Sequence, residues 1–281
     1  MLSYRHAFHA GNHADVLKHM VLVQLLRYMA KKDKPFTYVD THAGAALYAL
    51  QEGYAAKNAE YESGIARLWE RKDCPPLVAD YVAQVKACNP DGALRYYPGS
   101  PQIAQQLLRA DDKARVFELH SSDSALLQQH FRAQGRQVKV AAADGFTGLK
   151  SVLPPPSRRG VALIDPPYED KQDYKKVLEA LRDAQTRFAT GVYAVWYPML
   201  QREESVKLPE RLKRLQEKDW LHVSLTVQSP GEDGFGMHGS GMFVLNPPWT
   251  LPQELESVMP WLVKVLGQDG AAEYCLEYRL S

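Results

Sequence analysis

The sequence predicts an α/β fold in which helices cover both faces of a mostly parallel sheet. Two observations carry this prediction. Short apolar stretches of strand length alternate with stretches of helical periodicity along most of the chain. Small or polar residues follow directly after these strands, at the ends where parallel sheets bind ligands. The 281 residues, of which 45% are hydrophobic, suffice for one large domain with a full core.

The expected elements follow one another along the chain. An apolar helix over residues 14–30 ends at a lysine run and Pro35, because proline interrupts helical hydrogen bonding. Apolar stretches rich in β-branched residues predict strands at 36–40, 114–119, 137–141, 160–165 and 191–197. Helical periodicity lies near 121–133, 172–187 and 202–218. The chain closes with an antiparallel hairpin (221–227 and 239–246), a helix near 252–266 and a strand at 273–278.

One interval between strands is unusually long. The first strand ends at Asp40, and the next convincing strand begins near residue 114. An ordinary crossover needs far fewer residues. Because residues 47–95 contain two helical patterns and no clear strand, we expect a small helical insertion there, within a main domain formed by 1–46 and 96–281.

Composition excludes some classes of protein. The net charge of +1 argues against a protein that coats nucleic acid through bulk electrostatics, although Arg158, Arg159 and the basic residues of 202–218 are candidates for local phosphate contacts. No apolar stretch approaches the roughly 20 residues that span a membrane. The polar, histidine-rich N-terminus does not resemble a secretory signal. Three cysteines without metal-type spacing suit a reducing compartment, so we expect a cytoplasmic protein.

Three strand ends carry groups that suit a nucleoside. "DTHAGAA" at 40–46 supplies small residues that let the backbone approach a ligand, and the absence of G-x-G-x-x-G disfavours a dinucleotide oxidoreductase. Glu118 could accept hydrogen bonds from two adjacent ribose hydroxyls, and Asp144 in "ADG" could accept one from an adenine amine. Each is also explained by a turn or a surface acid. Together they favour a cofactor that contains a nucleoside.

The stretch "LIDPPYED" at 163–170 predicts the chemistry. An exocyclic amine of a nucleobase is a poor nucleophile, because its lone pair is delocalised into the ring. Asp165 and the rigidly held carbonyl of Pro166 could accept its N–H groups, and Tyr168 could stack on the base. These residues therefore indicate methylation of a base amine by a sulfonium donor. The structural alternative is a Pro-Pro turn that closes a buried strand.

A second motif of the same form, "NPPW" at 246–249, is an alternative catalytic motif, since its amide could accept the same hydrogen bond and its tryptophan could stack on a base. It follows the last strand of the hairpin, where the chain direction should point its end away from the cofactor cleft. We therefore assign the reaction to the motif at Asp165 and not to Asn246.

Seven motifs together resemble the ribosomal RNA large-subunit methyltransferase J family, within the class I S-adenosylmethionine-dependent methyltransferases. They are "LSYRHAFHAGNHADVLKH" at 2–19, "DTHAGA" at 40–45, "YYPGSP" at 96–101, "ELH" at 118–120, "ADGF" at 143–146, "SRRGVALIDPPYE" at 157–169 and "LNPPW" at 245–249. The resemblance implies a Rossmann-like methyltransferase domain with a small helical insertion. It also implies methylation of N6 of one adenine in 23S rRNA, with S-adenosyl-L-methionine as cofactor.

The resemblance also implies roles for individual residues. Asp165 is the implied catalytic acceptor, Tyr4 is an implied substrate contact, and Lys18 is a further candidate to border the cofactor. The implied cofactor contacts are His19, His42, Ser100, Glu118, Asp144, Gly145 and Asp165. The family's loop usually reads "DTHAGAG", so Ala46 replaces a glycine here, and we expect its φ to be negative.

Purely structural roles for some of these residues, and two other functions, are also consistent with the sequence. Ser100, before Pro101, could simply cap a helix. Residues His6, His9 and His13 have spacings that could suit a metal, but Gly11 and Asn12 interrupt their helix, so we expect no metal. We also expect the enzyme to be a monomer. Two other functions fit less well: DNA adenine-N6 methylation, for which a large target-recognition domain is missing, and a non-catalytic RNA-binding assembly factor, against which Asp165 and Tyr168 argue.

Overall fold

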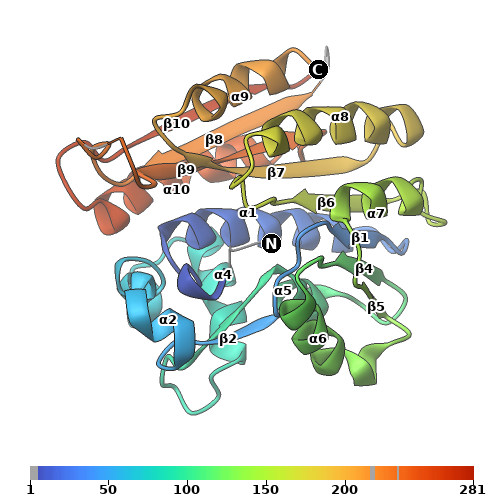
Figure 1. Ribbon diagram of the computed structural model, residues 1–281, viewed down its shortest axis with the longest axis horizontal. Helices are drawn as coiled ribbons and strands as arrows, with labels where there is room; N and C mark the ends of the chain where they lie inside the picture. Colours follow the sequence, from blue (N-terminus) through green and yellow to red (C-terminus); the bar gives the residue numbers. More distant parts are fainter. Residues whose placement is uncertain (1–5, 216–218, 233) are drawn as a thin grey trace.

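An eight-stranded sheet runs through the molecule in the order β10-β8-β9-β7-β6-β1-β4-β5 (Figure 1). The structure is a computed structural model that describes residues 6–215, 219–232 and 234–281. Within these ranges every helix is too short or too polar to cross a lipid bilayer.

Five strands of the sheet are parallel and confirm the predicted order. They are β1 (Thr37–Asp40), β4 (Lys113–Phe117), β5 (Val138–Ala141), β6 (Gly160–Ile164) and β7 (Val192–Met199). β1 pairs in parallel with both β4 and β6. From β1 the chain proceeds outward to β4 and β5 on one side and to β6 and β7 on the other, so the strand order reverses between β1 and β6. This reversal is a topological switch point, where open α/β sheets bind ligands.

The far half of the sheet is antiparallel, as the sequence predicts. β8 (Trp220–Thr226) and β9 (Gly239–Leu245) form the hairpin, and β9 inserts between β7 and β8. β10 (Glu273–Arg279) pairs with β8 at the edge. The α/β class, the mostly parallel sheet and the terminal hairpin are therefore confirmed.

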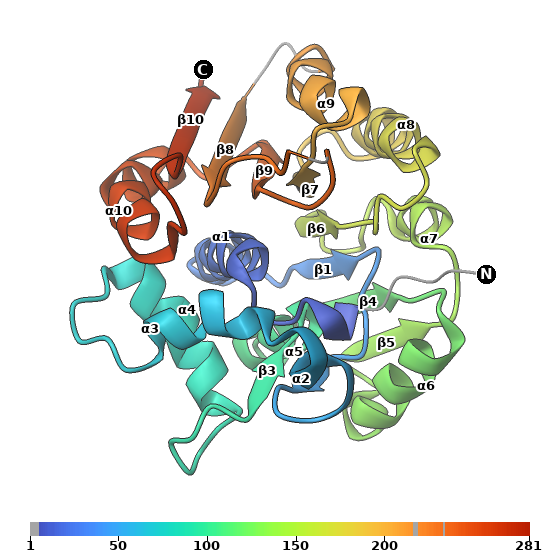
Figure 2. The same cartoon turned by 60° about the vertical axis from the view of Figure 1, so that its left-hand side comes forward.

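Helices cover both faces of the sheet, and Figure 2 shows α1, α4 and α10 on one side and α7, α8 and α9 on the other. On the first side the bounds are α1 (His13–Ala30), α4 (Pro76–Ala87), α5 (Ser100–Leu107), α6 (Ser121–His130) and α10 (Leu251–Leu266). On the second side they are α7 (Gly145–Val152), α8 (Gln172–Arg187) and α9 (Glu203–Lys213). The Asn12 side chain caps α1 by accepting from the backbone N–H groups of Ala14 and Asp15. This cap starts the helix at the edge of the sheet where the parallel strands end.

The long interval after β1 is mostly helical, but it also contains a strand. α2 (Gly53–Asn58), α3 (Ala66–Trp69) and α4 lie there, with a 3₁₀ turn at Glu60–Ser63. The expectation of no strand is wrong, because β2 (Leu47–Ala49) pairs antiparallel with β3 (Tyr96–Pro98). Three residues are too short for a recognisable period, and their partner lies far along the chain. The division into 1–46 with 96–281 and an insertion at 47–95 stays a prediction.

Ala46 lies in the left-handed region, with φ of 67°, so the expectation of a negative φ is wrong. The turn into β2 imposes this conformation, since the Ala46 carbonyl must accept a hydrogen bond of 2.7 Å from Gly99 N–H. A left-handed conformation costs an alanine about 1–2 kcal/mol.

We therefore expect Ala46→Gly to raise the free energy of unfolding by about 1 kcal/mol, because glycine adopts this φ without strain. Ala45, which is not in the left-handed region, supplies the matched control. Ala45→Gly should lower stability through the entropy of the unfolded chain. Chemical denaturation of both variants measures the difference, and equal losses of stability would contradict the strain at Ala46.

Candidate active site

A cleft lies at the C-terminal ends of β1, β4, β5 and β6, at the switch point of the sheet. It holds about 970 Å³ of free space, including the part open to solvent. All eight residues predicted from the sequence as cofactor neighbours line it: Lys18, His19, His42, Ser100, Glu118, Asp144, Gly145 and Asp165. Residues from six separate segments thus meet in one cavity, four of them because parallel strands end at a common edge and two because α1 and α5 begin there.

Glu118 is held by the turn that follows β1. One carboxylate oxygen accepts from Gly44 N–H at 2.8 Å, and the other accepts from His120 N–H at 2.7 Å. Burial raises the pKa of this carboxyl, whereas the two backbone donors oppose the rise. Gly44 has a φ of 63°, and an added Cβ would lie 2.1 Å from the Tyr48 hydroxyl, so only glycine fits. Each oxygen of Glu118 keeps a further lone pair for a ligand that carries adjacent hydroxyls.

Asp144 and Gly145 form the start of α7. Asp144 caps this helix by accepting from Thr147 N–H at 2.8 Å through Oδ2. A Cβ on Gly145 would lie only 1.7 Å from the Thr41 carbonyl oxygen. The segments that follow β1 and β5 can therefore lie this close together only because residue 145 is a glycine. This capping hydrogen bond is a sufficient structural reason for an acid at position 144, and a contact between Asp144 and a ligand stays a prediction.

Ser100 does not cap a helix, contrary to the simpler interpretation of its sequence. Its hydroxyl donates to Asp40 Oδ2 at 2.6 Å, and the Tyr38 hydroxyl donates to the same atom at 2.6 Å. Gly99 is the N-cap residue of α5. Burial raises the pKa of Asp40, and its two hydroxyl donors oppose that rise. Asp40 thereby fixes the start of α5 against the end of β1 on one wall of the cleft.

Two histidines in the cleft wall, the buried His19 and the half-buried His42, are neutral near pH 7. Burial lowers the pKa of His19 to about 3 and that of His42 to about 4. His19 Nδ1 lies 2.7 Å from the Tyr97 hydroxyl, whereas its buried Nε2 has no hydrogen-bond partner in the described part of the chain. A buried polar atom without a hydrogen-bond partner destabilises the fold, so a ligand in the cleft that forms a hydrogen bond with His19 Nε2 would remove this cost.

Asp165 belongs to a buried ionic group at the end of β6. Lys18 Nζ lies 2.6 Å from Asp165 Oδ2 and 2.9 Å from Asp15 Oδ1, and both lysine and Asp15 are almost fully buried. Burial raises the pKa of Asp165 to about 6, and Lys18 opposes that rise. Burial also disfavours the charge on Asp15, but His6 and Lys18 hold the pKa of its carboxyl well below the usual range. The sequence offered no signal for Asp15, which lies one turn before Lys18 on α1.

Tyr168 does not face the cleft, so the expectation that it stacks on a base is wrong. Its side chain is only 1% exposed, and its hydroxyl donates to the Trp196 carbonyl at 2.8 Å. The left-handed backbone at Tyr168, with φ of 54°, turns the ring inward against Tyr174. Pro167 lines the cleft instead, and the role of the Pro166 carbonyl stays a prediction.

The rival motif lies at the opposite edge of the sheet, as the sequence predicts. β9 runs antiparallel to β7, so its end lies beside the start of β7. There the Asn246 side chain donates to the carbonyls of Ala189 and Gly191. Trp249 is 72% exposed at that edge.

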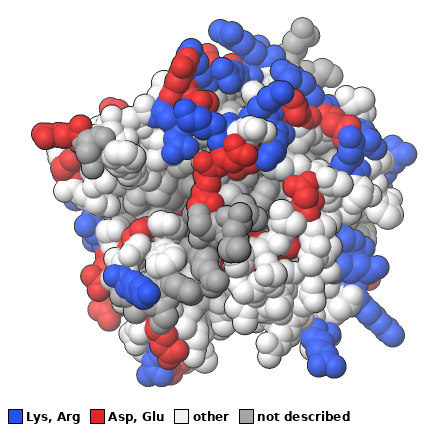
Figure 3. Space-filling model, viewed as in Figure 1, with Lys and Arg blue, Asp and Glu red and all other residues white. Residues whose placement is uncertain are grey.

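Arg158 and Arg159 do not border the cleft, so they cannot contact a phosphate inside it, and contacts with RNA elsewhere stay a prediction. They precede β6, and a five-residue strand places them about 16 Å from its far end. The Arg159 guanidinium donates to the carbonyls of Met29 and Lys34, near the end of α1. Basic and acidic side chains intermingle over α8 and α9 (Figure 3). Lys176 of α8, which lines the cleft, pairs with Asp173 at 3.0 Å.

The proposed substrate contact Tyr4 lies outside the described residues. Of the histidines considered for a metal, His6 pairs with Asp15 at 3.0 Å and His9 with Glu60 at 2.9 Å.

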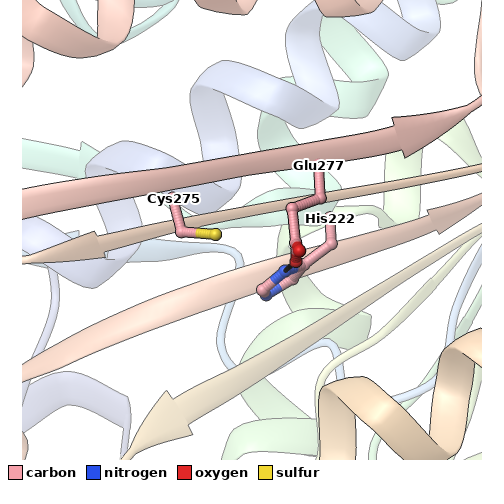
Figure 4. A group of neighbouring side chains, drawn as sticks. All are labelled: His222, Cys275 and Glu277. Atoms are coloured by element: carbon pink, nitrogen blue, oxygen red, sulfur yellow. Dashed lines mark hydrogen bonds and ion pairs between the residues drawn. The ribbon is translucent and has the colours of Figure 1, made fainter.

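Far from the cleft, His222, Cys275 and Glu277 form a cluster of metal-ligating types (Figure 4). Lys213 Nζ already lies 2.7 Å from the Glu277 carboxylate. His222 bridges Glu277 and the Tyr197 hydroxyl through its two ring nitrogens. Hydrogen bonds and ion pairs therefore account for His222 and Glu277 without a metal.

Comparison with known proteins agrees with this geometry. The family model described as ribosomal RNA large subunit methyltransferase D, RlmJ, matches residues 33–279. Two relatives named ribosomal RNA large subunit methyltransferase J are similar: one from Escherichia coli (49% identity over 270 residues, 96% of each chain) and one from Haemophilus influenzae (45% over 279 residues, 99% of each). The crystal structure of protein LPL1258 from Legionella pneumophila has 36% identity and a TM-score of 0.87, and the match covers 96% of this chain and 98% of that one. The chain therefore belongs to the RlmJ family of ribosomal RNA large subunit methyltransferases.

Proposed function

We propose that this protein transfers a methyl group from S-adenosyl-L-methionine to the N6 amine of one adenine in 23S rRNA, as a monomer in the cytoplasm. The proposal rests on one observation: two carboxylates suited to different roles line the same cleft. Glu118 presents an oriented carboxylate at the end of β4, and Asp165 presents a second one at the end of β6. Family membership supports ribosomal RNA of the large subunit as the substrate.

The residues of the cleft fit the cofactor. Glu118 would hold the ribose hydroxyls, and Asp144 would lie near the adenine ring. The unsatisfied Nε2 of His19 supplies a polar contact, and Gly44 lets the backbone approach closely. When bound, the cofactor supplies a methyl group on a positively charged sulfur.

The charges near Asp165 suit this reaction. With Asp15 and Asp165 ionised and Lys18 protonated, the three groups carry one net negative charge. A sulfonium is cationic, and the amine becomes cationic as it is methylated, so this excess stabilises both. Lys18 contacts Asp165 Oδ2, which leaves Oδ1 for an N–H of the target amine. The carboxylate then accepts the proton that the methylated amine releases.

Methyl transfer should depend on pH through Asp165, whose pKa burial raises to about 6. Only the ionised carboxylate can accept the amine proton. The single-turnover rate should therefore be constant above pH 7 and fall about tenfold per pH unit well below pH 6. Quench-flow measurements with saturating cofactor between pH 5 and 9 measure the profile. A rate independent of pH across this range would argue against Asp165 as the acceptor.

Labelled methyl transfer tests the function directly. Deproteinised rRNA, intact ribosomes and DNA are offered side by side, and the products are digested to nucleosides for chromatography. We expect label in N6-methyladenosine from rRNA. Label in DNA would favour the DNA enzyme instead, and cofactor binding without transfer to any of them would favour a non-catalytic assembly factor.

A further inference from the structure

The loop between β8 and β9 emerges at the same edge of the sheet as Asp165. Met199 at the end of β7 pairs with Gly239 at the start of β9, so the loop emerges at the edge where β6 ends. His238 N–H donates to the Met199 carbonyl at 3.2 Å, and the Gln201 side chain donates to the Gly231 carbonyl at 2.7 Å. The loop is therefore attached to the end of β7, on the side of Asp165 away from the cofactor residues of β1, β4 and β5.

Several buried polar atoms gather below this loop without partners. Ile164 pairs with Val195, so the next residues, Asp165 and Trp196, lie at the same level of the sheet. Trp196 is almost fully buried, and Lys18 Nζ lies 5.4 Å from the centre of its ring. Trp196 Nε1 has no hydrogen-bond partner among the residues that the structure describes.

Ser240 and His13 extend this group. Ser240 pairs with Pro198, two residues after Trp196, so both side chains project from the same face of the sheet, toward α1. Within the described ranges Ser240 Oγ, His13 Nδ1 and His238 Nδ1 also lack partners. His13 and His238 are close enough for their charges to interact. Unsatisfied buried polar groups are rare, and a cluster of them indicates a ligand that completes their hydrogen bonds.

The chemistry of these atoms suits a neutral heterocycle. An indole N–H can only donate, and a purine ring nitrogen that carries no proton can only accept. Burial lowers the pKa of His13 to about 4 and also lowers that of His238, so both imidazoles are neutral near pH 7 and can donate or accept. In adenine, a ring nitrogen adjacent to the reacting amine accepts a hydrogen bond, whereas the corresponding nitrogen in guanine carries a proton. A donor aimed at this position therefore favours adenine.

Phe235 is an exposed aromatic residue in the same loop, three residues before His238. Its ring is 80% exposed, and its neighbours Gly234 and Gly236 have φ of 77° and 88°. An added Cβ on Gly236 would meet no described atom within 4 Å, so the backbone around Phe235 has room to adjust. Single-stranded RNA is commonly held by bases that stack on exposed aromatic rings.

We propose that Phe235 and Trp196 form the substrate side of the active site. Phe235 stacks on an unpaired base next to the target, and Trp196 Nε1 donates a hydrogen bond to a ring nitrogen of the target adenine. This inference rests on the proposed function, because it takes rRNA as the substrate and Asp165 as the acceptor of the target amine.

Stacking is tested by Phe235→Ala with Trp249→Ala as its matched control, since Trp249 is a similarly exposed aromatic residue at the opposite edge of the sheet. Phe235→Ala should raise the KM for deproteinised 23S rRNA roughly 5- to 150-fold with little change in kcat. Phe235→Tyr should restore the KM, and Trp249→Ala should leave it unchanged. The Kd for the cofactor, measured by calorimetry, should be the same in all variants.

The hydrogen bond is tested by Trp196→Phe, which keeps a ring beside Lys18 but removes the N–H. The value of kcat/KM for rRNA should fall roughly 3- to 10-fold, while cofactor affinity is retained. Trp220→Phe is the control, since Trp220 begins β8, at the end of the strand away from the β8–β9 loop. It should leave kcat/KM unchanged. Equal behaviour of Trp196→Phe and Trp220→Phe would refute the contact.

Direct RNA binding separates failure of this inference from failure of the proposed function. The Kd for fluorescently labelled target RNA is measured by anisotropy, which needs no methyl transfer. If the wild-type protein methylates rRNA but Phe235→Ala binds it as well as Trp249→Ala does, the stacking is refuted and the function stands. If the wild-type protein methylates no rRNA, the proposed function fails, and weaker RNA binding by Phe235→Ala alone would still support the stacking surface.

Discussion

Replacing Asp165 by asparagine should lower kcat for methyl transfer by about 10²–10⁴-fold, the range typical for loss of a general base. The amide has the same shape, but it cannot take the amine proton and it removes the net negative charge of the group with Asp15 and Lys18. Single-turnover transfer of labelled methyl to rRNA measures the loss, and calorimetry measures cofactor binding.

The motif at Asn246 provides the control for this experiment. Asn246→Ala should keep most of the turnover per folded molecule, because its side chain ties the end of β9 to the start of β7, at the edge of the sheet opposite the cleft. It should lower thermal stability modestly, since one exposed and one partly buried hydrogen bond are lost. A greater loss of turnover in Asn246→Ala than in Asp165→Asn would reverse the assignment of the catalytic motif.

Replacing Lys18 by methionine should lower the free energy of unfolding by about 3–5 kcal/mol near pH 8, because it leaves two buried carboxylates without their shared cation. The loss should shrink as the pH falls, since Asp165, with a pKa of about 6 in the native enzyme, is protonated first and no longer repels Asp15. Chemical denaturation at several pH values measures the dependence.

The same substitution should also change the kinetics. Without the cation, the pKa of Asp165 rises further, so the acidic limb of the pH–rate profile should move to higher pH. Lys207→Met serves as the control, because Lys207 forms an exposed pair with Glu203 on α9 and such pairs contribute about 0–1 kcal/mol. An unchanged acidic limb in Lys18→Met would show that Lys18 does not set the protonation of Asp165.

The neighbours of the cleft could be predicted from the sequence because they follow strands. Glu118, Asp144 and Asp165 each come directly after an apolar stretch, and parallel strands must end at a common edge. The same reasoning correctly placed Asn246 at the opposite edge, since a hairpin reverses the chain direction. His19 and Ser100 do not follow strands of the large sheet, and their prediction rested on the resemblance to a known family.

Side-chain directions within irregular turns could not be predicted in this way. The ring of Tyr168 turns into the core because its backbone adopts a left-handed conformation, which depends on packing against Tyr174 and Trp196. Ala46 also adopts a left-handed conformation, because its carbonyl accepts a hydrogen bond from Gly99 N–H. Neither conformation follows from local preference, since both oppose it.

The sequence by itself therefore determined the α/β class, the order of strands, the position of the cleft and the acid at its centre, because all of these follow from local periodicity and chain direction. Only the tertiary structure decided that Lys18 lies between Asp15 and Asp165 and pairs with both, and that Trp196 and Ser240 lie on the face of the sheet that packs against α1. These groups come from a helix and two strands that are distant along the chain. Their interaction depends on distances that exist only after the helix has packed on the sheet.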